Sequence, residues 1–63
     1  MTYNYGYTVE FSIDVIDEIC SDPEHYRMLS FIKVMNDAEV HYKHGNATKN
    51  WYDSVCRILS EYV

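Results

Sequence analysis

Residues 9–24, VEFSIDVIDEICSDPE, contain a change of hydrophobic period that decides how the chain is expected to fold. Up to this change, apolar residues occupy the odd positions and mostly polar residues the even ones. The odd positions are Tyr3, Tyr5, Tyr7, Val9, Phe11 and Ile13. Because these residues are aromatic or β-branched and repeat every two positions, they predict a strand centred on residues 7–13, with a bend at Gly6.

The second half of the same stretch has a helical period. Val15, Ile16, Ile19 and Cys20 are spaced to lie on one side of a helix. Ser12 or Asp14 can cap its N-terminus, and Ser21-Asp22-Pro23 is expected to end it. The strand is therefore followed directly by a short amphipathic helix.

Two longer helices are predicted in the rest of the chain. Asp22-Pro23-Glu24 is typical of a helix start and Lys43-His44-Gly45 of a helix end, which predicts a helix over residues 23–43. Asn46 or Thr48 can cap the last helix. The expected core stripes of the two helices are Met28, Phe31, Ile32, Met35, Ala38 and Tyr42, then Trp51, Val55, Ile58, Leu59 and Tyr62, with Cys56 beside the second.

These elements predict one α+β domain over residues 1–63, in the order β-α-α-α. A lone strand needs partners for its backbone N–H and C=O groups. The chain can fold back as a hairpin around Gly6, pair with a second copy in a dimer, or add to a partner's sheet. We favour the dimer, because an exposed strand edge readily pairs with an identical edge.

The N-terminal sequence lacks the basic region and the apolar run of a secretory leader, and polar residues interrupt every apolar run of the chain. The chain is therefore expected in the cytoplasm. In that reducing compartment, Cys20 and Cys56 are expected to be buried thiols without a disulfide.

Charge is distributed unevenly along the chain, whose formal net charge is −5. Residues 1–24 contain acidic and no basic side chains, giving −6, whereas residues 25–63 carry +1. Such a balance disfavours direct binding to nucleic acids or anionic membranes, because both require a basic protein surface. A basic protein surface is the natural partner.

The acidic residues are spaced to share one face of the short helix. Asp14, Asp17, Glu18 and Asp22 fall opposite Ile16 and Ile19, and Glu10 extends the negative charge toward the N-terminus. At a rise of about 1.5 Å per residue, the carboxylates at every fourth position stand about 6 Å apart. That spacing is broadly similar to the spacing of phosphates along a nucleic-acid strand. The alternative is an ordinary solvated face.

Some of these acids have a local folding role and others do not. Asp22 and Glu24 suit the N-terminus of the predicted second helix. No such role is evident for Glu10, Asp14, Asp17 or Glu18, so these are the first candidates for partner binding.

The chain is rich in aromatic residues, with seven tyrosines among its 63 residues. Tyrosine is favoured at interfaces because it buries a large area and keeps a polar tip. Tyr42, Tyr62 and Trp51 are expected in the core, and Tyr26 in the core or on the surface. Tyr3, Tyr5 and Tyr7 are the interface candidates, against the alternative of ordinary strand packing.

Neither a metal site nor a catalytic site is predicted. Asp37, His41 and His44 share one helix flank, but a structural zinc site needs four ligands at recognisable spacing. The two cysteines lack the surroundings of a nucleophile, and no glycine-rich phosphate loop occurs. We therefore expect a non-enzymatic protein without a cofactor.

In size, charge and aromatic content the chain resembles small acidic phage-encoded inhibitors of host nucleic-acid-handling proteins. These include anti-CRISPR proteins, anti-restriction proteins and nucleic-acid mimics. The resemblance implies a stoichiometric inhibitor that binds a basic, nucleic-acid-binding protein through Glu10, Asp14, Asp17, Glu18 and Asp22, with Tyr3, Tyr5 and Tyr7 as anchors. The alternatives are an antitoxin or immunity protein that neutralises a basic toxin, and a homodimeric assembly module.

Overall fold

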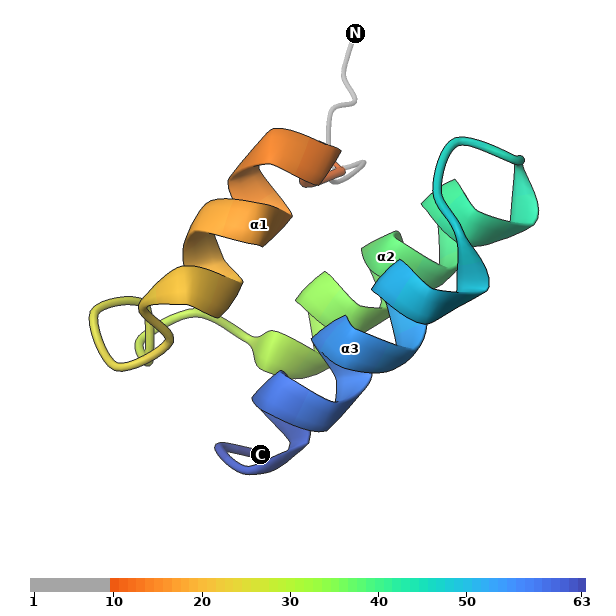
Figure 1. Cartoon of the computed structure of the whole chain (residues 1–63). Helices are drawn as coiled ribbons and strands as arrows, with labels where there is room; N and C mark the ends of the chain where they lie inside the picture. The colour runs from red at the N-terminus through yellow and green to blue at the C-terminus, as the bar shows by residue number, and fades with distance from the viewer. Residues whose placement is uncertain (1–9) are drawn as a thin grey trace, which may run out of the picture.

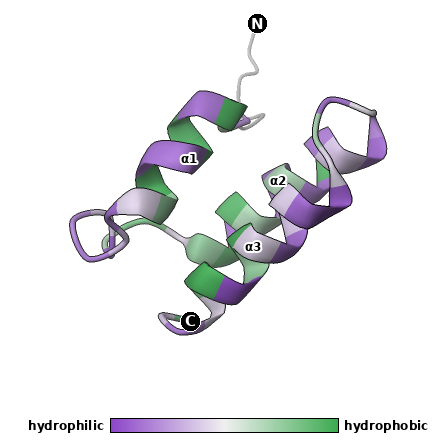
Figure 2. Cartoon of the chain, in the orientation of Figure 1, coloured by the Kyte–Doolittle hydropathy of each residue, from purple (hydrophilic) through white to green (hydrophobic). Residues whose placement is uncertain are grey.

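The computed structural model describes residues 10–63, which form three helices (Figure 1). They are α1 (Ile13–Ser21), α2 (Phe31–Lys43) and α3 (Lys49–Ser60). Helices α2 and α3 lie side by side in opposite directions, and α1 packs against both of them. Figure 2 shows apolar turns in all three helices and a mainly polar loop after α1.

Each helix begins at a hydroxyl side chain that caps its first turn. Ser12 accepts a hydrogen bond from the N–H of Val15, and Ser30 accepts one from Lys33. Thr48 does the same for Trp51 at 3.1 Å. These bonds satisfy N–H groups that have no partner inside the helix. Ser12 and Thr48 were each one of two caps predicted from the sequence, and both are confirmed.

The predicted N-terminal strand is wrong for the residues that can be checked, and so is the α+β class. Residues 10–63 contain no strand, and Ile13 already begins α1. The backbone of Phe11 is bound by two side chains of α2 instead of by a neighbouring strand. The strand pairing predicted for a dimer or a partner therefore has no basis in this part of the chain, and residues 1–9 lie outside the described residues.

The helix predicted over residues 23–43 begins eight residues later, at Phe31. Residues 22–29 form tight turns in which an N–H bonds the carbonyl three residues earlier, as in Tyr26 to Pro23 and Leu29 to Tyr26. Ser30 then adopts an extended conformation and caps α2. As a result Leu29 packs against the core, whereas Met28 is 91% exposed instead of lying in the expected stripe.

The predicted end of this helix at Lys43-His44-Gly45 is confirmed. Gly45 has a φ of +80°, which is favourable only for glycine among common residues. The N–H of Gly45 bonds the carbonyl of Tyr42, and the N–H of Asn46 bonds that of His41. These two bonds form a Schellman motif and reverse the chain toward α3.

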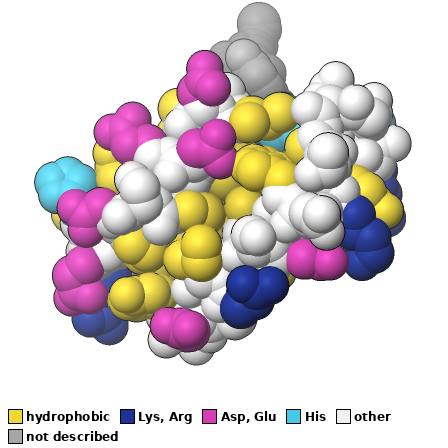
Figure 3. Space-filling view, viewed as in Figure 1, with side chains coloured by type: hydrophobic (Ala, Val, Ile, Leu, Met, Phe, Trp, Pro, Cys, Tyr) yellow, Lys and Arg dark blue, Asp and Glu magenta, His cyan; other side chains and the backbone are white. Residues whose placement is uncertain are grey.

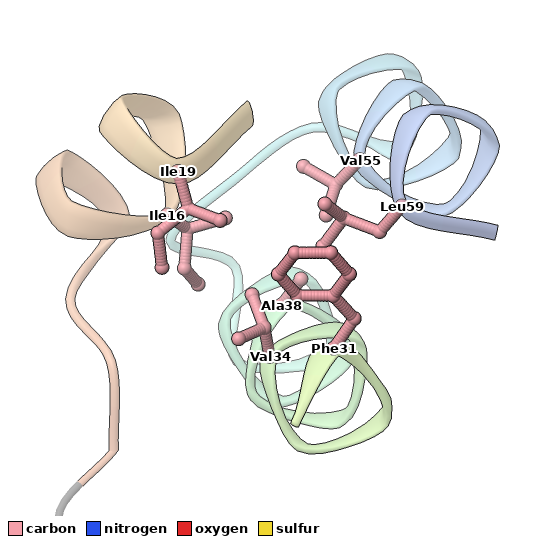
Figure 4. Close-up of a cluster of buried hydrophobic side chains, with 7 residues drawn as sticks. All are labelled: Ile16, Ile19, Phe31, Val34, Ala38, Val55 and Leu59. Carbon is pink, nitrogen blue, oxygen red and sulfur yellow. The ribbon is translucent and has the colours of Figure 1, made fainter. Parts of the chain in front are cut away.

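The three helices share one small hydrophobic core (Figure 4). Its buried residues are Ile16, Ile19, Phe31, Val34, Ala38, Val55 and Leu59. The apolar stripes predicted for α1 and α3 correctly included four of these residues, namely Ile16, Ile19, Val55 and Leu59. In α2 the prediction missed Val34 and wrongly included Ile32, which is 64% exposed.

Candidate functional site: the acidic face of α1

The candidate carboxylates of the described residues all lie on the surface. They are Glu10 before α1, Asp14, Asp17 and Glu18 within it, and Asp22 at its C-cap. Ile16 and Ile19 point the other way, into the core, so the predicted division of α1 into two faces is confirmed. Figure 3 shows acidic side chains gathered over α1 and the loop that follows it. Tyr3, Tyr5 and Tyr7 lie outside the described residues.

Asp17 has a structural partner that the sequence did not reveal. The indole N–H of Trp51 donates a hydrogen bond to its carboxylate, with 2.6 Å between the nitrogen and the oxygen. This bond joins α1 to α3. It also gives the half-buried Trp51 the acceptor that a tryptophan in a core usually needs.

Glu18 is held in a similar way by Tyr26. The phenol donates to the Glu18 carboxylate at 2.5 Å, and this hydrogen bond raises the pKa of Tyr26. Asp22 accepts the N–H of His25 at the start of the turns. The idea that Asp17 and Glu18 lack a folding role is therefore wrong, and Asp22 belongs to the end of α1 instead of the start of α2.

These partners position the carboxylates without neutralising them, because indole, phenol and amide donors carry no net charge. Four of the five Lys and Arg side chains form ion pairs elsewhere: Arg27 with Glu24, Lys33 with Asp37, Lys43 with Glu39 and Lys49 with Asp53. Within residues 10–63, none of the acids on the α1 face takes part in an ion pair. No cation of the described residues therefore compensates the negative charge of this face.

Asp37 and His41 hold the chain just before α1. The Asp37 carboxylate is buried, accepts the N–H of Phe11 at 2.9 Å, and binds the Lys33 ammonium at 2.7 and 2.8 Å. The Nε2–H of His41 donates to the Phe11 carbonyl at 2.8 Å, because a carbonyl can only accept. The predicted polar flank is therefore a clamp on the Phe11 backbone, which fixes the start of α1 against α2.

A signal for this clamp was present in the sequence. Lys33, Asp37 and His41 are spaced by four residues, so they form one row along α2. The predicted flank of Asp37, His41 and His44 did not include Lys33, and burial of Asp37 was not expected from the sequence. Within residues 10–63, no group of three potential ligands is arranged to hold a metal ion.

Both cysteines are free thiols, as predicted, but they are half-buried instead of buried. Burial, together with the nearby charges of Asp17 and Cys56, raises the pKa of Cys20 to about 11. The thiolate is the reactive form. A buried thiol with this environment is therefore protected at neutral pH.

Alkylation of Cys20 is expected to be slow and to keep accelerating well above pH 9. At pH 8 its thiolate fraction is about a hundredth of that of a thiol with the ordinary value of 9.0. Iodoacetamide labelling at several pH values, read by peptide mass spectrometry, measures the rate. The same protein in urea is the control, since unfolding should restore the ordinary rate, and equal rates in the two states would contradict the assignment.

Comparison of the chain with known protein families, characterised proteins and solved structures finds no match. The function must therefore be argued from the chain itself. Residues 10–63 enclose no pocket, so the acidic face is an open surface. None of the helices in this part is both long enough and apolar enough to cross a membrane.

Proposed function

We propose that this protein is a non-enzymatic, cytoplasmic inhibitor that binds a basic surface of a nucleic-acid-binding protein in a fixed stoichiometry. The contact surface is the acidic face of α1, formed by Glu10, Asp14, Asp17, Glu18 and Asp22. The observation that carries this proposal is the uncompensated charge of that face in a chain whose other basic and acidic side chains largely pair with each other. Complementary charge steers association and excludes wrong partners.

The hydrogen bonds from Trp51 and Tyr26 support a binding role for the face. They hold Asp17 and Glu18 in one orientation before any partner arrives. Ordering a side chain on binding costs about 0.5–1.5 kcal/mol, so a carboxylate that is already ordered binds more favourably. Asp14, Glu18 and Asp22 also follow one another at intervals of about 6 Å along α1, which is broadly similar to the spacing of phosphates along a nucleic-acid strand.

The three N-terminal tyrosines complete the proposed surface. The clamp on Phe11 fixes the chain beside the first turn of α1. Tyr7 and Tyr3 are separated from Phe11 by at most about 14 Å and 28 Å of extended chain. They are therefore within reach of a protein bound to the acidic face, where tyrosine side chains supply buried anchors.

Reversing the charge of Glu10 and Asp14 is expected to weaken binding by about tenfold or more and to flatten its salt dependence. These two are the best probes because, among residues 10–63, neither side chain makes a hydrogen bond that folding would lose. The partner is first captured from lysate on the immobilised protein at low salt. Its nucleic-acid binding is then titrated with wild type and with the Glu10→Lys, Asp14→Lys double variant.

The control places a comparable charge change, +3 against +4 for the α1 variant, outside the face, at the exposed Glu61 and at Asn50, which is also exposed. Wild type and the Glu61→Lys, Asn50→Lys control should both block nucleic-acid binding at one equivalent. Equal inhibition by the α1 variant would mean that its acids form only a solvated face. A captured protein whose nucleic-acid binding is unaffected at saturation would also contradict the proposal.

A further inference from the structure

The boundary between α1 and α3 is an apolar surface with an acidic rim. The Trp51–Asp17 hydrogen bond places the facing edges of the two helices side by side. Half-buried apolar side chains follow this edge at helical spacing: Cys20 is three residues after Asp17, and Ile58 is seven after Trp51. Figure 3 shows a strip of apolar surface between the acids over α1 and the side chains of α3. We call this strip the α1–α3 seam.

The seam has the chemistry of a helix-binding surface. Residues 10–63 enclose no pocket, so there is no enclosed space for a small ligand. A further helix can pack along the boundary between two helices, because its side-chain ridges interdigitate with theirs. An amphipathic helix binds such a surface through apolar residues at three- and four-residue steps.

The charge beside the seam selects the kind of helix. Asp17 lies at its edge and Asp14 stands one turn earlier on α1, both exposed and outside any ion pair of the described residues. A helix with Lys or Arg beside its apolar stripe would place those cations opposite these carboxylates. An acidic helix would be repelled, and so would a nucleic acid.

We propose that the α1–α3 seam receives a basic amphipathic helix of the partner protein. The apolar side of that helix packs on Cys20, Trp51 and Ile58, and its cations face Asp14 and Asp17. This inference rests on the proposed function, because it uses two of the same carboxylates. It adds that the partner contributes a helix, and that apolar packing as well as charge determines the affinity.

A peptide pair separates the two contributions. The probe is a fluorescein-labelled helical peptide of about 18 residues, built from Leu and Lys in an amphipathic pattern and containing no Trp. The control peptide has the same amino-acid composition, but its residues are reordered so that the leucines no longer share one side of the helix. The amphipathic peptide is expected to bind at least about tenfold more tightly than the reordered one. An unlabelled amphipathic peptide should also shift the emission of Trp51, the single tryptophan of the chain.

A seam variant provides a second measurement. Ser54 is half-buried between Trp51 and Ile58 on the same side of α3, so Ser54→Lys adds bulk and positive charge there without removing core atoms. It should weaken the amphipathic peptide by about tenfold. Asn36→Lys, which makes the same charge change on the exposed side of α2, should leave the affinity within about twofold of wild type. Circular dichroism establishes that both variants are folded.

The outcomes distinguish this inference from the proposed function. Tighter binding of the amphipathic peptide with a Trp51 response and a Ser54→Lys defect supports the seam. Equal, salt-sensitive binding of both peptides without a Trp51 response overturns the seam but leaves an acidic docking face. If neither peptide binds at low salt, both the seam and the acidic docking face are contradicted.

Discussion

Asp37→Ala is expected to lower the free energy of unfolding by about 3 kcal/mol. The Asp37 side chain is 2% exposed and binds both the Lys33 ammonium and the N–H of Phe11. Alanine would leave a partly buried cation and a backbone N–H without their acceptor. Urea unfolding followed by circular dichroism at 222 nm measures the loss. A domain of this size has roughly 3 to 9 kcal/mol of stability in total, so this loss is at least about a third of it.

Helix α3 provides a matched control for this experiment. Lys49 and Asp53 are also a Lys–Asp pair at four-residue spacing, but their side chains are 68% and 47% exposed. Asp53→Ala should therefore cost less than about 1 kcal/mol. Asp37→Asn separates charge from hydrogen bonding, because its amide oxygen can still accept the Phe11 N–H, and it should lose less than Asp37→Ala. Equal losses for Asp37→Ala and Asp53→Ala would show that the clamp on Phe11 does not stabilise the fold.

The parts of the fold that the sequence predicted are those specified by neighbouring residues. Helices α1 and α3 combine a hydroxyl cap with apolar residues at helical spacing, and both signals lie within about three turns of chain. The buried pairs Ile16 with Ile19 and Val55 with Leu59 follow from that spacing alone. Gly45 similarly marks the end of α2, because its positive φ is a local requirement.

The errors arose where a local signal competed with tertiary structure. Alternating apolar residues predicted a strand through Ile13, but Ser12 caps a helix there and Phe11 is bound by side chains from a distant helix. Pro23 suits the first turn of a helix and equally suits a tight turn. Asp22 accepts the N–H of His25, but only turns follow it, and Ser30 caps α2 at Phe31.

The sequence was enough to predict that the carboxylates of α1 are exposed, but not which side chains donate hydrogen bonds to them. The helical period of α1 is enough to place Asp14, Asp17 and Glu18 on the outer face. The donor for Asp17 is Trp51, 34 residues away, and no sequence spacing connects the two. The ion pairs, in contrast, are local, because each of them joins residues three or four positions apart. Sequence spacing could therefore have shown that these basic residues pair away from α1.

Leu59→Ala is expected to destabilise the domain by about 3 kcal/mol, as much as the loss of Asp37 but through a different mechanism. Leu59 is fully buried and belongs to a core of only seven buried residues contributed by all three helices. Truncation removes apolar burial and leaves a cavity that neighbouring side chains fill incompletely. Urea unfolding should show a lower midpoint, and thermal unfolding a melting temperature lower by more than about 10 °C.

The comparison with Ile32→Ala tests whether burial, instead of helix composition, sets this cost. Ile32 was predicted as a core residue and is 64% exposed, so its truncation should change stability by less than about 0.5 kcal/mol. Alanine is the better helix former, which acts in the same direction in both variants. A large loss at Ile32 would mean that a surface covers it in solution, whereas a small loss at Leu59 would contradict the three-helix core. Leu59→Ala leaves every carboxylate of α1 unchanged. The molecules of this variant that remain folded should therefore still bind a basic partner. This result would separate the stability of the fold from the binding chemistry of the acidic face.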